Sequence, residues 1–397
     1  MKYRWILLSW LVCCTATVAP AQEDYEDIGT FEPFWRHSAA LGGYNGNDFH
    51  SGGQGLEVVP DHLMRNNDFP YPKRPYPKEN MFADHLSLVR ILGGFSGGDS
   101  DPVVRALDVV YTNAAGEYVF RPDLLEERLT PYLDNGYTNF TVVFDNIPWD
   151  FTDEPRTGPY GQVGIPRDFD DWTDFVTTFC SNFVDLIGTE NTAGLRFRTG
   201  TEFHALDRFH GTESEFMDFY NSCWRGVSNV LPNTSFGPYN FYSPSVSQMD
   251  AHSGPHNVNS LLIPQEKDSA APFDWASSST YYSPGQSPSS RLSGLFDVWD
   301  EFEDRYPAMP PPSREIHEFG ILNSSHQEPG ALGGAMTAQM IMRLRARGLD
   351  RLWHWWMLDK FRDQDNVLQN FLISDAWLYS IFEYARGGDS WTLYPTG

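Results

Sequence analysis

The chain has 397 residues, a formal net charge of −25 at pH 7 and 15% aromatic residues, among them 13 tryptophans. An acidic surface repels polyanions, so the composition argues against binding to nucleic acid and to anionic membranes. Tryptophan and tyrosine serve either as core residues or as stacking surfaces in binding clefts, and composition alone does not decide between these uses.

The first 21 residues have the pattern of a secretory signal peptide. Lys2 and Arg4 precede an apolar stretch over 6–12, and Ala19-Pro20-Ala21 supplies small residues before Gln22. No later stretch approaches the roughly 20 apolar residues of a membrane span. We therefore expect a secreted protein, extracellular or periplasmic, with a soluble mature chain.

Residues 22–80 are rich in turn formers, and a first strand is expected near 34–41. From residue 84, short apolar runs typical of buried strands alternate with longer runs at helical spacing. The expected strands are 86–92, 139–144, 195–201, 235–241, 273–282, 314–320 and 352–358. The expected helices are 121–133, 169–187, 216–230, 292–302, 334–347 and 367–386.

Strand–helix alternation over roughly 300 residues predicts an α/β fold with a parallel sheet and helices outside it. The number of units favours closure into a (β/α)₈ TIM barrel over an open sheet. We expect one catalytic domain over 22–397, with long loops and no further C-terminal module.

Four cysteines are present, two of them in the expected signal peptide. Lipid attachment at Cys13 or Cys14 is the weaker alternative to signal-peptide cleavage, because neither follows a small residue. Cys180 and Cys223 fall on consecutive expected helices, and secretion permits a disulfide, so we predict a Cys180–Cys223 bond. The alternative is two free thiols on apolar helix faces.

Two apolar strands each present a glutamate where they end. Glu202 follows the strand 195–201, and Glu318 lies near the end of the strand 314–320. Hydrolysis of a glycosidic bond needs one carboxylic acid to protonate the leaving oxygen and a second carboxylate to attack the sugar or activate water. A single glutamate at a strand end is more often a salt bridge or a loop cap. Two such glutamates, on the fourth and seventh strands of one barrel, favour a catalytic pair. The carboxyl ends of all barrel strands meet at one face, which brings the two side chains together.

With these motifs, the stretch 86–386 resembles the clan A glycoside hydrolases, most of all family 39, which contains β-xylosidases and α-L-iduronidases. Arg198-Thr199-Gly200-Thr201-Glu202 is similar to the end of the family's fourth strand, and His317-Glu318-Phe319-Gly320 to the end of its seventh. The resemblance implies a retaining double displacement with Glu202 as acid/base and Glu318 as nucleophile. Thr201 departs from the pattern, since the clan usually has an asparagine there that contacts the sugar's 2-hydroxyl.

Other polar and aromatic residues at strand ends are candidates for substrate binding. Clan members carry an arginine after the second strand that keeps the nucleophile ionised, and an aromatic residue or histidine at the end of the sixth. Trp149 and Trp355 are candidates for stacking walls, and Trp355 cannot face the same way as Trp356 on one strand. The complete candidate set is Arg90, Trp149, Thr201, His204, Tyr282, His317 and Trp355.

His204, Asp207 and His210 have a spacing that metal ligands can adopt, but nothing else completes a site, so no catalytic metal or cofactor is expected. The expected partner is a carbohydrate substrate, such as a marine or algal galactan or a xyloside. Two alternatives stay open: a non-catalytic carbohydrate-binding barrel, and a polysaccharide lyase with a tyrosine or histidine base. No oligomeric state is indicated.

Overall fold

The structure is a computed structural model. It describes residues 35–41, 57–58, 85–134, 136–158, 161–204, 208–242, 269–282, 288–307, 311–323, 326–327 and 347–355, with isolated positions at 246, 264, 343 and 344. The expected signal peptide, the expected helix over 367–386, most of the expected helix over 334–347, and Asp207 and Trp356 lie outside the described residues.

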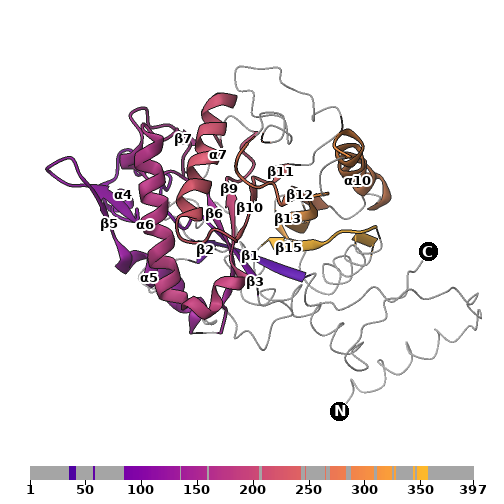
Figure 1. Ribbon diagram of the computed structural model, residues 1–397, viewed down its shortest axis with the longest axis horizontal. Helices are drawn as coiled ribbons and strands as arrows, with labels where there is room; N and C mark the ends of the chain where they lie inside the picture. Colours follow the sequence, from indigo (N-terminus) through magenta and orange to yellow (C-terminus); the bar gives the residue numbers. More distant parts are fainter. Residues whose placement is uncertain are drawn as a thin grey trace, which may run out of the picture.

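The centre of the molecule is a parallel sheet whose strands follow the order β10-β9-β6-β3-β1-β15-β13-β12-β11 (Figure 1). Its strands are β1 (Trp35–Leu41), β3 (His85–Val89), β6 (Asn139–Phe144), β9 (Arg196–Thr199), β10 (Ser235–Pro238), β11 (Phe241–Tyr242), β12 (Trp275–Tyr282), β13 (Ser313–Asn323) and β15 (Arg351–Trp355). All neighbours along this path pair in parallel. The predicted α/β class is thereby confirmed.

The two ends of this strand order lie on one extended segment. β10 pairs with β9, β11 pairs with β12, and only Tyr239 and Asn240 separate β10 from β11 in the chain. The polar residue Asn240 therefore sits at the junction of the two strands, where it is fully buried.

Helices and short elements connect the strands. The longer helices are α5 (Pro122–Leu133), α6 (Phe169–Ile187), α7 (Glu213–Ser228) and α10 (Pro288–Arg305). The short elements are β2 (Glu57–Val58), α4 (Pro102–Arg105), β4 (Val110–Thr112), β5 (Tyr118–Phe120), η2 (Trp149–Phe151), β7 (Thr157–Gly158), β8 (Gly161–Gln162), η3 (Thr189–Gly194) and β14 (His326–Gln327). Within the described part of the chain, no helix has the length and apolarity needed to cross a bilayer.

Local sequence fixes where α6 and α7 begin. The Asp168 carboxylate accepts hydrogen bonds from the first free N–H groups of α6, and Thr212 and Glu215 form a reciprocal capping box at the start of α7. The two helices lie side by side against one part of the sheet, and α10 lies on the other side of the molecule (Figure 1).

The strands alternate between an apolar outer face and a polar inner face. On β6, Phe140 and Phe144 face the helices, where their rings meet Phe183 and Phe179 of α6 edge-on at 5.8 Å. Thr141, which directly follows Phe140, points inward and bonds His85 at 2.8 Å. This period of two places the polar side chains of neighbouring strands together inside the sheet's curve. The inner set includes His85, Thr141, Arg196, Arg198, Glu315 and His317, all buried.

The predicted Cys180–Cys223 disulfide is wrong. Both cysteines are buried free thiols. They lie on α6 and α7, neighbouring helices as expected, but the sulfur of Cys223 accepts a hydrogen bond from the Trp172 indole N–H at 3.2 Å. Helix adjacency does not supply the specific Cα and Cβ approach that a disulfide needs, and both thiols serve as small apolar core residues.

Candidate active site

Glu202 is presented by a tight turn that follows β9. Gly200 and Glu202 have positive φ values of 82° and 53°, and a Cβ on Gly200 would meet the ring of Phe203 at 2.5 Å. The Glu202 N–H donates to the backbone oxygen of Asn240 at 3.2 Å. A non-glycine residue in the left-handed region is uncommon, and such residues cluster at functional sites.

Glu318 reaches the interior because β13 contains a bulge. Opposite β12, Ile316 pairs with Ser278 and Glu318 pairs with Ser279, so that His317 is the extra residue. Ile316 and Phe319 both pack in the outer apolar core. Strict alternation would point Glu318 to the face opposite Glu315, and the extra residue brings both carboxylates to the interior.

Both carboxylate oxygens of Glu318 accept hydrogen bonds. The Asn240 side-chain Nδ2 donates to Oε1 at 3.1 Å, and the Tyr281 hydroxyl donates to Oε2 at 3.0 Å. Two donors, one on each oxygen, match an ionised carboxylate, which only accepts. They also fix its orientation.

Glu202 has the opposite character. Burial, followed by the negative charge of Glu318, raises the pKa of Glu202 to about 7. Arg208 opposes this shift, and its guanidinium donates to Glu202 Oε2 at 3.2 Å. A hydrogen bond from the Ser279 hydroxyl opposes it further. A carboxyl group that holds its proton near neutral pH can act as a general acid.

Arg198 is a buried cation whose charge acts on both carboxyl groups. Its surroundings lower its pKa to about 10, mainly through burial, while the charges of Glu318, Asp145 and Glu202 act in the other direction. Its Nη2 donates to the Thr201 hydroxyl at 3.0 Å, and Thr201 donates to Asp145 Oδ2 at 3.3 Å. Thr201, a candidate substrate contact, thus lies within this inner network.

Arg90 follows β3 with a positive φ of 61°, and its backbone N–H donates to Asp145 Oδ1 at 2.9 Å. Its side chain is buried. The described hydrogen bond of Arg90 therefore joins the ends of β3 and β6, and a role in keeping Glu318 ionised stays a prediction.

Of the two tyrosines at the end of β12, Tyr281 and not the predicted Tyr282 lies at the candidate active site. Tyr281 reaches Glu318, whereas Tyr282 lies in the outer apolar core, because successive residues of a strand face opposite ways. Trp149 is buried, and its indole N–H donates to the Phe95 carbonyl at 3.0 Å, so it supports a loop instead of offering an open stacking face. Trp355 lies on β15, where the structure describes only its backbone.

The two histidine candidates lie in different surroundings. His204 stacks on Phe241 with ring centroids 4.2 Å apart, and burial lowers its pKa to about 4. His317 is buried deeper, bonds Glu315 through Nε2 at 2.7 Å, and has its pKa lowered to about 3, mainly by burial. Within the described residues, no group of His, Cys, Asp and Glu side chains is arranged to hold a metal ion.

Several residues of this site were not predicted as candidates. For most of them, their position along a strand could have indicated that they face the interior. Arg198 alternates with the outward-facing Phe197 on β9, which marks it as an inward polar residue of a buried strand. The site residues outside the predicted candidate set are Asp145, Arg198, Arg208, Asn240, Ser279 and Tyr281. All but Arg208 lie at the ends or in the second halves of parallel strands, where such sites form.

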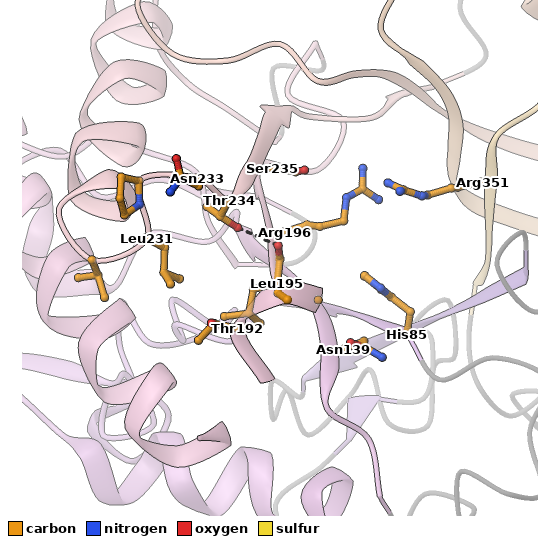
Figure 2. Close-up of a pocket in the computed structure, with 14 residues that line it drawn as sticks. His85, Asn139, Thr192, Leu195, Arg196, Leu231, Asn233, Thr234, Ser235 and Arg351 are labelled. Atoms are coloured by element: carbon orange, nitrogen blue, oxygen red, sulfur yellow. Dashed lines mark hydrogen bonds between the residues drawn. The ribbon is translucent and has the colours of Figure 1, made fainter. Parts of the chain in front are cut away.

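A cavity of about 540 Å³ lies at the opposite end of the strands (Figure 2). It is lined by the first residues of β3, β6, β9, β10 and β15, namely His85, Asn139, Arg196, Ser235 and Arg351. In Figure 2 the guanidinium groups of Arg196 and Arg351 point toward one another. Glu202 lies beyond the other end of β9, and Glu318 lies in the middle of β13. Neither glutamate lines the cavity, so it is separate from the candidate active site.

No protein-family model matches the chain. Its structure is similar to that of a GH39 enzyme from Xanthomonas axonopodis pv. citri, with a TM-score of 0.57 and 12% identity over 84% of this chain and 60% of that one. It is also similar to a monomeric β-xylosidase from Caulobacter crescentus CB15, with a TM-score of 0.59 and 13% identity over 83% of this chain and 61% of that one.

A third similar structure is the bacterial orthologue of human α-L-iduronidase, with a TM-score of 0.53 and 13% identity over 84% of this chain and 50% of that one. A stretch of 131 residues is 22% identical to an alpha-1,4-L-rhamnosidase from Formosa agariphila, and covers 31% of this chain and 27% of that enzyme. The chain spans 50% to 61% of the length of the three structures. At this level of identity the likeness concerns the fold, and this chain has the fold of the family 39 glycoside hydrolases, as its strand-end motifs indicated.

Proposed function

We propose that this protein is a secreted glycoside hydrolase that cleaves a poly- or oligosaccharide with retention of configuration. The observation that carries the proposal is the pairing of two buried glutamates of opposite character. Glu202 has its pKa raised to about 7, and Glu318 accepts a hydrogen bond on each oxygen. A general acid must hold its proton near the working pH, whereas a nucleophile must be ionised and aligned.

In the proposed first step, a carboxylate oxygen of Glu318 attacks the anomeric carbon while the glycosidic C–O bond breaks. The proton of Glu202 moves to the leaving oxygen, and a glycosyl ester on Glu318 results. In the second step, ionised Glu202 takes a proton from a water molecule whose oxygen attacks the same carbon, and Glu318 leaves as a carboxylate. Two displacements at one carbon retain its configuration.

Closure of the sheet into a single (β/α)₈ barrel is part of the proposal. It is supported by the segment 235–242, which pairs with β9 through β10 and with β12 through β11. The similar proteins include a β-xylosidase, an α-L-iduronidase orthologue and an α-L-rhamnosidase, which supports a glycoside as the substrate class. Xylosides and marine or algal galactans are the first substrates to test.

The test compares wild-type protein with Glu202→Gln, Glu318→Gln and the exposed control Glu126→Gln on a panel of polysaccharides and aryl glycosides. We expect Glu318→Gln to lower kcat by about 10⁴-fold or more on every substrate, because no other group replaces the nucleophile. Glu202→Gln should lose activity on natural glycosides and keep much of it on aryl glycosides with acidic phenols, which leave without a proton.

Anomeric NMR of the first product should show retained configuration. An inverted product, or activity that survives Glu318→Gln, would overturn the mechanism. Binding of a glycan without turnover by wild-type protein would favour a carbohydrate-binding barrel, and an unsaturated product absorbing in the ultraviolet would favour a lyase.

A further inference from the structure

Asn240 touches both sides of the candidate active site. Its side-chain Nδ2 donates to Glu318 Oε1 at 3.1 Å and to the Ser279 hydroxyl oxygen at 2.5 Å. Its backbone oxygen accepts the N–H of Glu202 at 3.2 Å. One fully buried residue at the junction of β10 and β11 therefore holds the carboxylate of one glutamate and the backbone of the other.

Ser279 completes the connection. Its hydroxyl accepts from Asn240 at 2.5 Å, and its proximity to the Glu202 carboxyl group favours the ionised form of that group. A serine hydroxyl has one proton to donate and two lone pairs that accept, so both contacts are possible at once. The result is a continuous row of polar groups that runs from Glu318 through Asn240 and Ser279 to Glu202.

The direction of each hydrogen bond in this row is set by charge. Both N–H bonds of the Asn240 amide are used, one on Glu318 and one on Ser279. A flipped amide would place its oxygen against the Glu318 carboxylate, which cannot donate when it is ionised. With Asn240 donating to it, Ser279 has its proton available for Glu202.

We propose that Asn240 and Ser279 are positioning residues that form a neutral bridge between the two catalytic carboxyl groups. This inference rests on the proposed function. In the bridge, Asn240 holds Glu318 aligned for attack. Ser279 donates to Glu202 when that group has given up its proton and must next accept one from water. The bridge contains no charged group. It therefore connects the two carboxyl groups without adding an ion pair to either of them.

Strand β12 offers a matched control for Ser279. Ser278 is its neighbour, equally buried, and its hydroxyl bonds Thr280 Oγ1 at 3.0 Å on the opposite face of the strand. Replacing either serine with alanine removes one buried hydroxyl from the same strand. Only the Ser279→Ala change removes a donor to Glu202.

The experiment measures kcat and kcat/KM against pH for Ser279→Ala, Ser278→Ala, Asn240→Ala and Asn240→Asp, with thermal unfolding to confirm folding. We expect Ser279→Ala to move the alkaline limb of the kcat/KM profile to higher pH by about half a unit or more. The ionised form of Glu202 loses a hydrogen-bond donor, and the pKa of Glu202 therefore rises. Ser278→Ala should leave the limb in place.

Asn240→Ala should lower kcat by about 10²-fold with little change in KM, since it removes one donor from the nucleophile. Asn240→Asp keeps the shape of the side chain but puts a second carboxylate beside Glu318. Its activity should therefore recover toward acidic pH, where an aspartic acid can donate again. This isosteric variant keeps the inference testable if Asn240→Ala does not fold.

Profiles of Ser279→Ala and Asn240→Asp that match the profile of Ser278→Ala would overturn the bridge. That outcome is distinct from failure of the proposed function, because Glu202→Gln and Glu318→Gln would still abolish retaining hydrolysis. Activity that survives Glu318→Gln would instead overturn the proposed function, and the bridge with it.

Discussion

At the scale of single residues, the character of Glu202 depends on which charges and hydrogen bonds reach it. Burial and Glu318 raise its pKa, and Arg208, Ser279 and Arg198 act against them. Arg208 is the outermost of these groups, with 18% of its side chain exposed, and it comes from the segment after the turn that presents Glu202. It is therefore the group whose removal disturbs the buried site least.

We predict that Arg208→Gln moves the alkaline limb of the kcat/KM profile to higher pH, by about one unit. In the proposed mechanism the first step needs protonated Glu202, so activity should fall as pH rises through the pKa of Glu202. Loss of the nearby positive charge raises that pKa further. The control is Arg225→Gln, which removes an exposed arginine that pairs with Asp170 at 3.4 Å. A limb that stays in place, or moves to lower pH, would contradict the prediction.

At the scale of elements, two features bring the site together. The bulge at His317 turns Glu318 inward, and the contact between α6 and α7 supports the strands that carry Glu202 and Asn240. That contact depends on Gly226 of α7. A Cβ at this position would meet Val176 at 2.6 Å and the backbone oxygen of Thr173 at 2.8 Å, both on α6.

Gly226→Ala should lower the free energy of unfolding by about 1–3 kcal/mol, because overpacking between two rigid helices outweighs the better helix propensity of alanine. Gly294→Ala in α10 should raise it by about 0.5–1 kcal/mol, since no atom in the described part of the chain lies within 4 Å of the added methyl group. Urea unfolding of both variants gives the comparison. A gain in stability for Gly226→Ala would show that the helices separate without cost.

At the scale of the whole molecule, a buried ionic cluster connects four strands of the sheet. Arg196 of β9 bonds Glu315 of β13 at 2.8 Å and lies over the rings of Trp275 on β12 and Trp353 on β15. His317 donates to the same carboxylate. Although burial opposes a charge there, Arg196 and His317 hold the pKa of Glu315 well below its usual range.

Because of this cluster, we predict that the free energy of unfolding decreases at acidic pH. The folded-state pKa of His317 is lowered to about 3 from its ordinary 6.5, so the unfolded chain binds the proton more readily. The contribution of neutral His317 to the free energy of unfolding is therefore complete above about pH 6.5 and is lost as pH falls toward about 3. Wild-type protein should therefore lose about 3 kcal/mol more than His317→Gln between pH 6.5 and 4, because glutamine does not titrate. Urea unfolding of both proteins at several pH values gives the comparison. If the free energy of unfolding depends on pH equally in wild-type protein and in His317→Gln, the prediction is refuted.

The sequence alone determined the α/β class and most strand and helix positions. Apolar runs such as 139–144 and the helical spacing over 169–187 are local patterns, and the structure keeps both bounds as predicted. It also predicted the two glutamates as a pair, because each lies at or near the end of an expected apolar strand. These features follow from the periods of strand and helix, which any short window of sequence contains.

Only the tertiary structure decided which neighbours face the site. It selected Tyr281 over Tyr282, left Cys180 and Cys223 as free thiols, and brought Asn240 and Ser279 to Glu318 and Glu202. The reason is physical: a one-residue bulge at His317 reverses which side chains point inward, and the junction at Asn240 depends on the pairing of β10 and β11 with two different strands. Strand register and sulfur approach are set by contacts between segments far apart in the chain, which no local pattern records.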